Sequence, residues 1–175
     1  MAAVITKSTF ISNIETALRT FNDVRQAGAN LKVATATLEV AATDDDDSIY
    51  DFVRLPAQAI PYSALIVSDA IAGATDYDLG VYTPVEGGTP TAVDADCLAD
   101  GVDINAGFAV PTELLGHTGG IPDPADYGQK PLWELAGVSA DPGDDVLYDI
   151  CLTANTVGTA AGTITLAIVY AVMGN

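Results

Sequence analysis

Hydrophobic residues recur with a helical period near the start of the chain. Between residues 9 and 25 they lie three or four positions apart, at Phe10, Ile11, Ile14, Leu18, Phe21 and Val24. Ser12 and Glu15 have the spacing of a capping box, and Gly28 suits the end of a helix. The pattern predicts an amphipathic helix that starts near Thr9 or Ser12.

After Asn30 the hydrophobic period changes from that of a helix to that of a strand. Strands are expected near 32–42, 48–55, 61–71, 77–81, 92–98, 102–104, 145–153 and 162–173. Three side chains are expected to share one face in each of the early strands, namely Ile49, Val53 and Leu55, then Leu65, Val67 and Ile71. The cleanest alternation is in the last two strands, and it is typical of antiparallel sheets with one face buried.

Turn residues separate these strands. Asp44 to Asp47 form an acidic turn, and glycine with small residues at 158–162 predicts a hairpin turn. Residues 105–130 are rich in glycine and proline and are expected to form a long surface excursion. Residues 131–137 could form one helical turn that carries Trp133 inward.

About eight short strands predict an all-β fold, an antiparallel two-sheet sandwich that is jelly-roll-like. We expect two parts: an N-terminal arm at 1–31, helical or extended, and a β-sandwich domain at 32–175. The length of 175 residues fits a single sandwich of this kind.

Charge is distributed unevenly between these parts. Residues 1–32 hold four basic and two acidic residues, net +2, whereas the rest holds two basic and 22 acidic residues, net −20. So acidic a body repels nucleic acid and anionic membranes, which leaves the arm as the segment suited to an acidic partner. The expected partner-binding residues are Phe10, Ile11, Ile14, Leu18, Arg19, Phe21 and Arg25. The alternative is that this helix packs on its own domain.

Composition indicates self-association. Charged residues make up 17% of the chain, against about 25% in typical soluble domains. Weakly polar surface of this kind is often covered by other subunits, so we expect a homo-oligomer or a lattice subunit. The acidity either serves solubility alone or keeps a densely packed assembly from clumping. Cys97 and Cys151 could form one bridge, although reduced thiols are expected.

No catalytic or cofactor motif is present in the sequence, so no enzyme activity, metal or cofactor is expected. His117 is the sole histidine and is read as a solvated loop residue. Asp94, Asp96, Asp100 and Asp103 invite a calcium hypothesis, but they lack EF-hand spacing, so solvated turns are preferred. The N-terminus lacks the apolar core of a secretion signal, and the C-terminal apolar run of 12 residues is too short to span a bilayer.

Five segments resemble small structural proteins of tailed bacteriophages, the head decoration or capsid cement proteins. They are ATLEVAATDDDDSIYDFVRLPAQAIP (36–61), DAIAGATDYDLGVY (69–82), ADCLADGVDI (95–104), LWELAG (132–137) and DICLTANTVGTAAGTITLAIVY (149–170). The resemblance implies a jelly-roll-like, non-enzymatic virion protein on the capsid exterior, made in the host cytoplasm. It also implies the major capsid protein as partner and a homotrimer, with a dimer as the alternative state.

A second class of function fits the same predicted fold. A carbohydrate-binding jelly roll used for adhesion would stack sugars on exposed aromatic rings. Trp133, Tyr82 and Tyr127 are the candidates for that role.

Overall fold

A computed structural model describes residues 30–117 and 126–172 of this chain. The predicted helix at 9–25, with all seven expected partner-binding residues, lies outside these ranges. The predicted boundary between arm and sandwich therefore stays a prediction.

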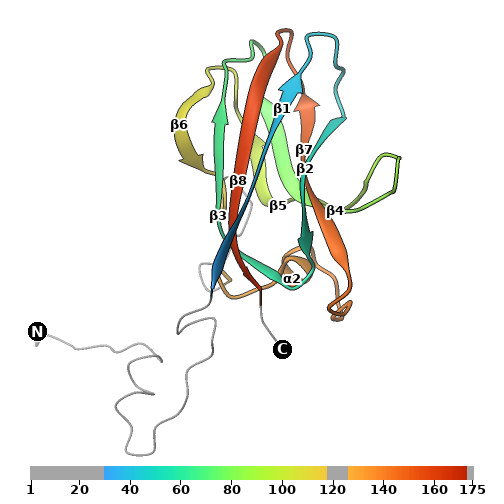
Figure 1. Cartoon of the computed structure of the whole chain (residues 1–175). Helices are drawn as coiled ribbons and strands as arrows, with labels where there is room; N and C mark the ends of the chain where they lie inside the picture. The colour runs from blue at the N-terminus through green and yellow to red at the C-terminus, as the bar shows by residue number, and fades with distance from the viewer. Residues whose placement is uncertain (1–29, 118–125, 173–175) are drawn as a thin grey trace, which may run out of the picture.

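The described chain consists of eight strands and one short helix (Figure 1). The elements are β1 (Leu31–Val40), β2 (Ser48–Pro56), β3 (Ala59–Ser68), β4 (Asp76–Thr83), β5 (Thr91–Val102), β6 (Phe108–Glu113), α2 (Leu132–Leu135), β7 (Leu147–Thr156) and β8 (Gly162–Val172). Sheet A has the order β1-β8-β3-β6, and sheet B has the order β2-β7-β4-β5. Every pairing within the two sheets is antiparallel.

This order is that of a jelly roll, so the predicted all-β, two-sheet sandwich of about eight strands is confirmed. The core lies between the inner faces of the sheets. β7 contributes Ile150 and Leu152, β8 contributes Leu166 and Ile168, and all four side chains are almost fully buried. The predicted burial of one face is therefore confirmed for β8, whereas in β7 Asp149 and Cys151 on the other face are buried as well.

The predicted faces of β2 and β3 are only partly correct. Val53 shares a face with Leu55, and Leu65 with Val67, but Ile49 lies on the other face of β2 and Ile71 lies beyond the end of β3. In β2 the buried residues include Tyr50 and Phe52, because a bulge between Asp51 and Val53 shifts the alternation. In β3, Ala64, Ile66 and Ser68 point inward, while Leu65 and Val67 are on the outer face. Both faces of β3 are apolar at these positions, so hydrophobicity alone could not distinguish them.

Two connections and one strand also differ from expectation. The excursion at 105–130 contains β6, a six-residue strand that pairs with β3 through Leu65 and Glu113. Residues 158–162 are not a hairpin turn, because they link β7 in sheet B to β8 in sheet A. The two strands predicted near 92–98 and 102–104 are one strand up to Val102, which is β5.

The predicted helical turn is present as α2 at one end of the sandwich (Figure 1). Leu132 is buried there, and the half-buried Trp133 donates its indole N–H to Oε1 of Gln58 at 3.3 Å. Within the described ranges no helix is long and apolar enough to cross a membrane.

Candidate interaction surface

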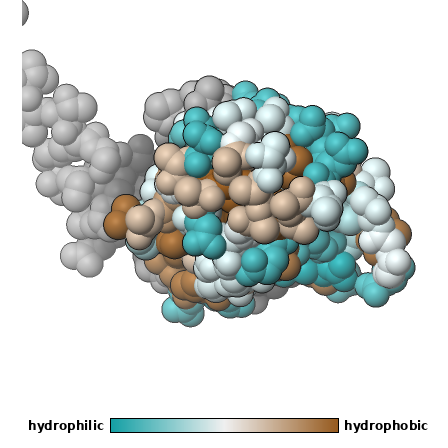
Figure 2. Space-filling model, turned by 90° about the horizontal axis from the view of Figure 1, so that it is seen from above, coloured by the Kyte–Doolittle hydropathy of each residue, from teal (hydrophilic) through white to brown (hydrophobic). Residues whose placement is uncertain are grey.

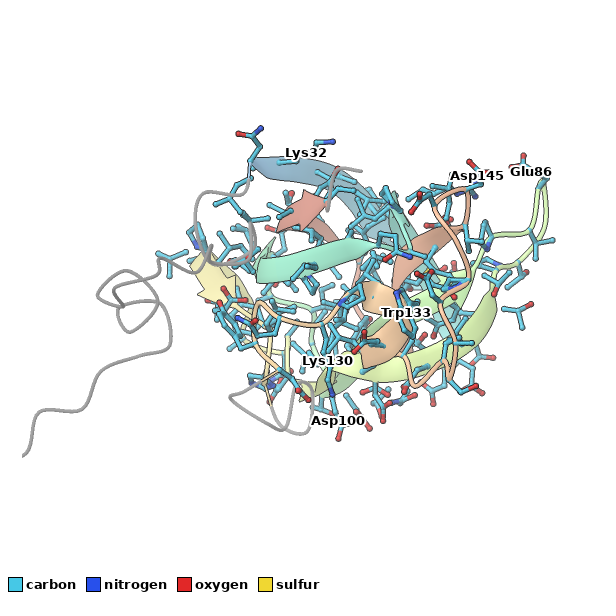
Figure 3. The ribbon with its side chains drawn as sticks, turned by 90° about the horizontal axis from the view of Figure 1, so that it is seen from below. Lys32, Glu86, Asp100, Lys130, Trp133 and Asp145 are labelled. Carbon is cyan, nitrogen blue, oxygen red and sulfur yellow. The ribbon has the colours of Figure 1, made fainter. Side chains whose placement is uncertain are left out.

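The two sheets differ strongly in charge. The strands of sheet A hold three charged residues, Lys32, Glu39 and Glu113, for a net charge of −1. The strands of sheet B hold one arginine, Arg54, and seven aspartates, for a net charge of −6; the aspartates are Asp51, Asp76, Asp78, Asp94, Asp96, Asp100 and Asp149. Figure 3 places Lys32 and Asp100 on opposite sides of the sandwich. The molecule therefore has one weakly charged side and one acidic side.

The outer face of sheet A, here called the neutral face, follows from the strand register. Residues of β1 that point outward lie opposite outward residues of β8, as Val33 lies opposite Val169 and Thr37 opposite Thr165. The neutral face comprises Leu31, Val33, Thr35, Thr37, Ser63, Leu65, Val67, Ala109, Pro111, Thr163, Thr165, Ala167 and Val169, together with two carboxylates that the register also turns outward, Glu39 opposite Thr163 and Glu113 opposite Leu65. Leu31 and Val33 are 58% and 64% exposed, which is unusual for aliphatic side chains in a strand.

The two glutamates of sheet A are tied to neighbouring groups. Glu39 accepts a hydrogen bond from the Thr163 hydroxyl at 2.7 Å. Glu113 accepts from the Ser63 hydroxyl at 2.5 Å, from the Ala64 amide at 2.8 Å and from the Leu115 amide at 3.0 Å. These donors hold both carboxylates at the margins of the neutral face.

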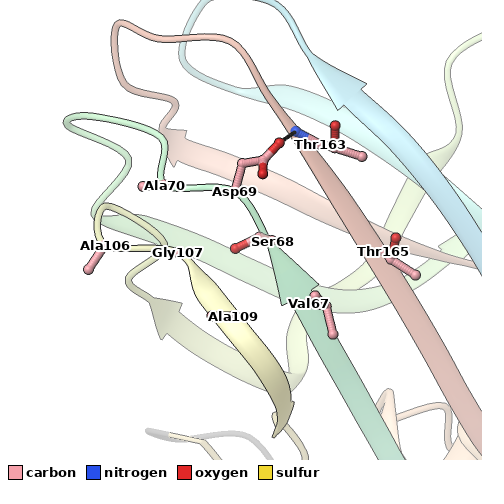
Figure 4. A pocket seen from close by; sticks show the side chains of 9 residues that line it. All are labelled: Val67, Ser68, Asp69, Ala70, Ala106, Gly107, Ala109, Thr163 and Thr165. Carbon is pink, nitrogen blue, oxygen red and sulfur yellow. Dashed lines mark hydrogen bonds between the residues drawn. The ribbon is translucent and has the colours of Figure 1, made fainter.

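A shallow groove of about 450 Å³ lies on this side, where β3, β6 and β8 meet (Figure 4). Asp69 stands at its rim, and its carboxylate accepts the amide of Thr163 at 3.0 Å. The remaining lining is small: Val67, Ser68, Ala70, Ala106, Gly107, Ala109, Thr163 and Thr165. No aromatic ring lines the groove, so it lacks the stacking surface that sugar sites use.

The same end of the sandwich carries weakly hydrophobic loops. Seen from above, such residues form a band across the middle of this end, with hydrophilic residues around it (Figure 2). The exposed alanines of these loops are Ala70, Ala72, Ala106 and Ala161. The small-residue surface thus continues from the groove onto the end of the molecule.

On the acidic side, carboxylates of Asp76, Asp78 and Asp100 lie within 4.8 Å of one another. Asp78 accepts the amide of Gly101 at 3.0 Å and the side-chain amide of Asn155 at 2.6 Å. Loss of hydration, together with the nearby charge of Asp78, raises the pKa of Asp100. The cluster differs from the one considered in the sequence, since it joins Asp100 to β4, and protein N–H groups account for the oxygens of Asp78.

An ion pair between an exposed arginine and a buried aspartate lies on the same sheet. Asp149 is 1% exposed, and it accepts two hydrogen bonds from the Arg54 guanidinium, at 2.6 and 3.1 Å. Arg54 also donates to Glu86 at 3.1 Å, in the loop between β4 and β5. The arginine therefore joins β2, β7 and this projecting loop.

The aromatic residues proposed for sugar stacking do not all reach the surface. Tyr82 is 1% exposed and hydrogen-bonds to Thr153, so it offers no free ring face. Tyr127 is 46% exposed, and its hydroxyl donates to the carbonyl of Tyr62. Trp133 is held by Gln58 as described above.

Three other residues singled out in the sequence, His117, Cys97 and Cys151, are wholly or partly buried. His117 is not a solvated loop residue, because its Nδ1 is buried and has no hydrogen-bond partner among the described residues. Cys151 is fully buried and Cys97 partly buried, and both are free thiols. Burial raises the pKa of each cysteine, which keeps it protonated and unreactive.

Two solved structures resemble this chain. A chain in the capsid of Ralstonia phage GP4 has a TM-score of 0.59 and 13% identity, with 85% of this chain and 89% of that chain covered. A chain in the cyanophage Pam1 capsid asymmetric unit has a TM-score of 0.50 and 19% identity, with 96% of this chain and 98% of that chain covered. Both share its fold. No family model matches the sequence, and no curated protein matches it.

The neutral face was missed by the sequence analysis, which assigned binding to the arm alone. A signal was present: the segments 59–68 and 162–172 contain no charged residue in a chain of net charge −18. That signal has meaning only once the two segments are known to be adjacent strands of one sheet.

Proposed function

We propose that this protein is a non-enzymatic structural component of a phage virion, which binds the outside of the capsid lattice and stabilises it. The observation that carries the proposal is the fold, shared along most of the chain with chains of two phage capsids. The sequence resemblance to decoration proteins supports the same role. The partner is then the major capsid protein.

The physical basis of such a role is repetition. Each copy on a lattice needs only a modest contact, since many contacts act together at high effective concentration. The neutral face carries only two carboxylates, both hydrogen-bonded, so a shell of like charge would repel it less than it repels the acidic sheet B. The acidic sheet B would then face solvent and keep coated particles apart.

The arm is the proposed anchor, through Phe10, Ile11, Ile14, Leu18, Arg19, Phe21 and Arg25. Its net charge of +2 is opposite in sign to that of the body, and its hydrophobic residues recur along one side of the predicted helix. The core cluster of the described residues is formed by residues from Val40 onward, so the sandwich is expected to fold without the arm. The proposed assembly on the particle is a homo-oligomer, a trimer by resemblance or a dimer.

The test is uptake by capsids stripped of this protein. Deletion of residues 1–30 should abolish co-sedimentation with capsids, while circular dichroism and melting show a folded body. A finer variant, Phe10→Ser with Leu18→Ser, should weaken uptake strongly. Leu147→Ser is the matched control, because Leu147 is 43% exposed on the body, and it should bind normally.

Normal capsid occupancy by the deleted protein would contradict the anchoring role. Failure of the intact protein to bind capsids at all would contradict the proposed function. Strong, selective hits on a glycan array would instead favour the carbohydrate-binding alternative, for which the described surface offers little aromatic stacking area.

A further inference from the structure

The neutral face exposes hydrophobic side chains. Seven large hydrophobic side chains among the described residues are exposed, and three of these lie on this face, namely Leu31, Val33 and Val67. Between them the face is made of threonine, alanine, leucine and valine from β3 and β8. Exposed apolar side chains that gather on one face of a protein mark a surface that another segment or molecule covers.

The charged groups of this surface are acidic. Glu39 and Glu113 lie on the face, and Asp69 stands at the rim of the groove. Lys32 points to the other side of the sheet, because β1 is regular and its side chains alternate. An occupant that combines apolar side chains with positive charge would therefore complement the face.

The arm that leads into β1 has this combination. Its net charge is +2, opposite in sign to that of the body. In the predicted helix Arg25 follows Leu18 by seven positions and Phe21 by four, so these three residues share one side. Glu15 and Arg19 lie away from that side. One side of the helix thus carries both the hydrophobic residues and a positive charge.

The predicted helix also matches the face in length. As a helix, residues 9–25 span about 25 Å at 1.5 Å per residue. Along β1, the distance from the row of Leu31 to the row of Glu39 is about 26 Å at 3.3 Å per residue. Residues 26–30 reach at most about 17 Å, which is enough for the chain to reverse direction beside the start of β1. A reversed helix would run along the face toward the groove.

We propose that in the free protein the arm folds back and packs the hydrophobic side of its helix on the neutral face of the same copy. Tethering favours this occupant, because a short linker holds the arm close to the face at a high effective concentration. A second copy is disfavoured, because the acidic bodies repel each other. Lys7, which precedes the helix, would lie at the groove end of the face, where Asp69 offers a carboxylate.

The consequence for assembly rests on the proposed function. The arm is the proposed anchor and the neutral face is the proposed contact with the shell, so folding back covers both in the free protein. The free subunit would then expose little apolar surface to other copies. On the particle, the shell must displace the arm from its own sheet, so binding of the arm and uncovering of the face occur together.

The test measures thiol labelling of the full-length protein without capsids. Val67→Cys places a thiol on the face, whereas the native cysteines are wholly or partly buried. Adding Ile14→Ser with Leu18→Ser should detach the arm and raise the labelling rate by about tenfold or more, because a covered thiol reacts only in the open state. The matched control, Glu15→Ser with Arg19→Ser, alters the other side of the helix at constant net charge and should leave the rate unchanged.

A second thiol checks that the effect is local to the face. Thr91→Cys lies at the exposed start of β5 in sheet B, so the arm substitutions should not change its labelling rate. Melting curves establish that each variant is folded. Equal labelling of Val67→Cys with and without the substitutions at Ile14 and Leu18 overturns the proposal.

A disulfide identifies which copy supplies the arm. Ala167 lies opposite Thr35, about 13 Å along β1 from the row of Leu31, and Leu18 lies about 10 Å from the end of the predicted helix. Leu18→Cys with Ala167→Cys should therefore form a disulfide within one chain under mild oxidation, whereas Leu18→Cys with Thr91→Cys should not. Disulfide-linked dimers or larger species in place of the intramolecular bond would assign the face to the arm of another copy and overturn the proposal.

The outcomes separate this proposal from the proposed function. Protection of Val67→Cys that is lost with the substitutions at Ile14 and Leu18, in a protein that capsids never bind, supports the folded-back arm and overturns the capsid role. An unprotected Val67→Cys in a protein that capsids take up overturns the folded-back arm and leaves the capsid role intact.

Discussion

Replacing Gly80 by alanine should destabilise the protein through a backbone collision. Gly80 lies in β4 opposite Cys151, and the bulged part of β5 crosses directly over it. A Cβ at this position would lie 2.2 Å from the carbonyl carbon of Ala95 and 2.3 Å from the carbonyl oxygens of Asp94 and Ala95. Relaxed contacts between carbon atoms are about 3.5–4.0 Å, so β5 would have to move by more than about 1 Å.

The size of the effect follows from what must move. Overpacking of a well-packed region costs about 1–3 kcal/mol, and we expect the upper end because all three obstacles are backbone atoms. For a domain of this size a loss of about 3 kcal/mol lowers Tm by about 6–12 °C. Gly88→Ala is the control, since its Cβ would meet only the Val85 side chain, whose Cγ1 lies at 2.8 Å and can rotate away.

Thermal melting of the two variants beside the wild type checks this expectation. Any gain from a stiffer unfolded chain is common to both substitutions and cancels in the comparison. A second reading is the rate at which Cys97 reacts with a thiol reagent, which should rise in Gly80→Ala as β5 lifts from β4. A Tm for Gly80→Ala within about 2 °C of that for Gly88→Ala would refute the described crossing.

Two further predictions concern charge on sheet B. The folded state raises the pKa of Asp100, so its carboxylate destabilises the fold above that pKa and not below the ordinary value near 3.8. Asp100→Asn should therefore raise Tm at pH 7 but not at pH 3, and an equal change at both would contradict this. Arg54→Gln leaves Asp149 buried without its cation and should lower the urea midpoint more than Glu86→Gln, because the Glu86 side chain is 93% exposed. The reverse order would show that Arg54 acts mainly through the loop.

The fold class could be predicted because alternation marks the strands that bury one face only. Ile164, Leu166 and Ile168 alternate with Thr163, Thr165 and Ala167, so β8 is recognisable from local sequence. β3 is harder, since its outer face is as apolar as its inner one and no period distinguishes Leu65 from Ile66. β6 is hidden for another reason: its pairing with β3 joins residues almost fifty positions apart, which no local pattern records.

The candidate surface, like the fold, could be predicted only in its local features. The arm's basic residues and hydrophobic period are local features and were read from the sequence, and they lie outside the described residues. The neutral face depends on strands from four parts of the chain coming together in one sheet. The spacing of Asp76, Asp78 and Asp100 also reflects pairing between strands, and the sequence suggested a different group around Asp94 and Asp103.

The unequal charges of the two sets of strands contribute an electric dipole across the thickness of the sandwich. The layers of a sandwich are about 10 Å apart, so a charge of −6 in one set of strands and −1 in the other creates a strong field gradient over a short distance. The electric field of an anionic body exerts a torque on this dipole, which turns sheet A toward that body before contact. Orientation would then precede capture, and added salt, by weakening that torque, would lower the fraction of encounters that arrive the right way round.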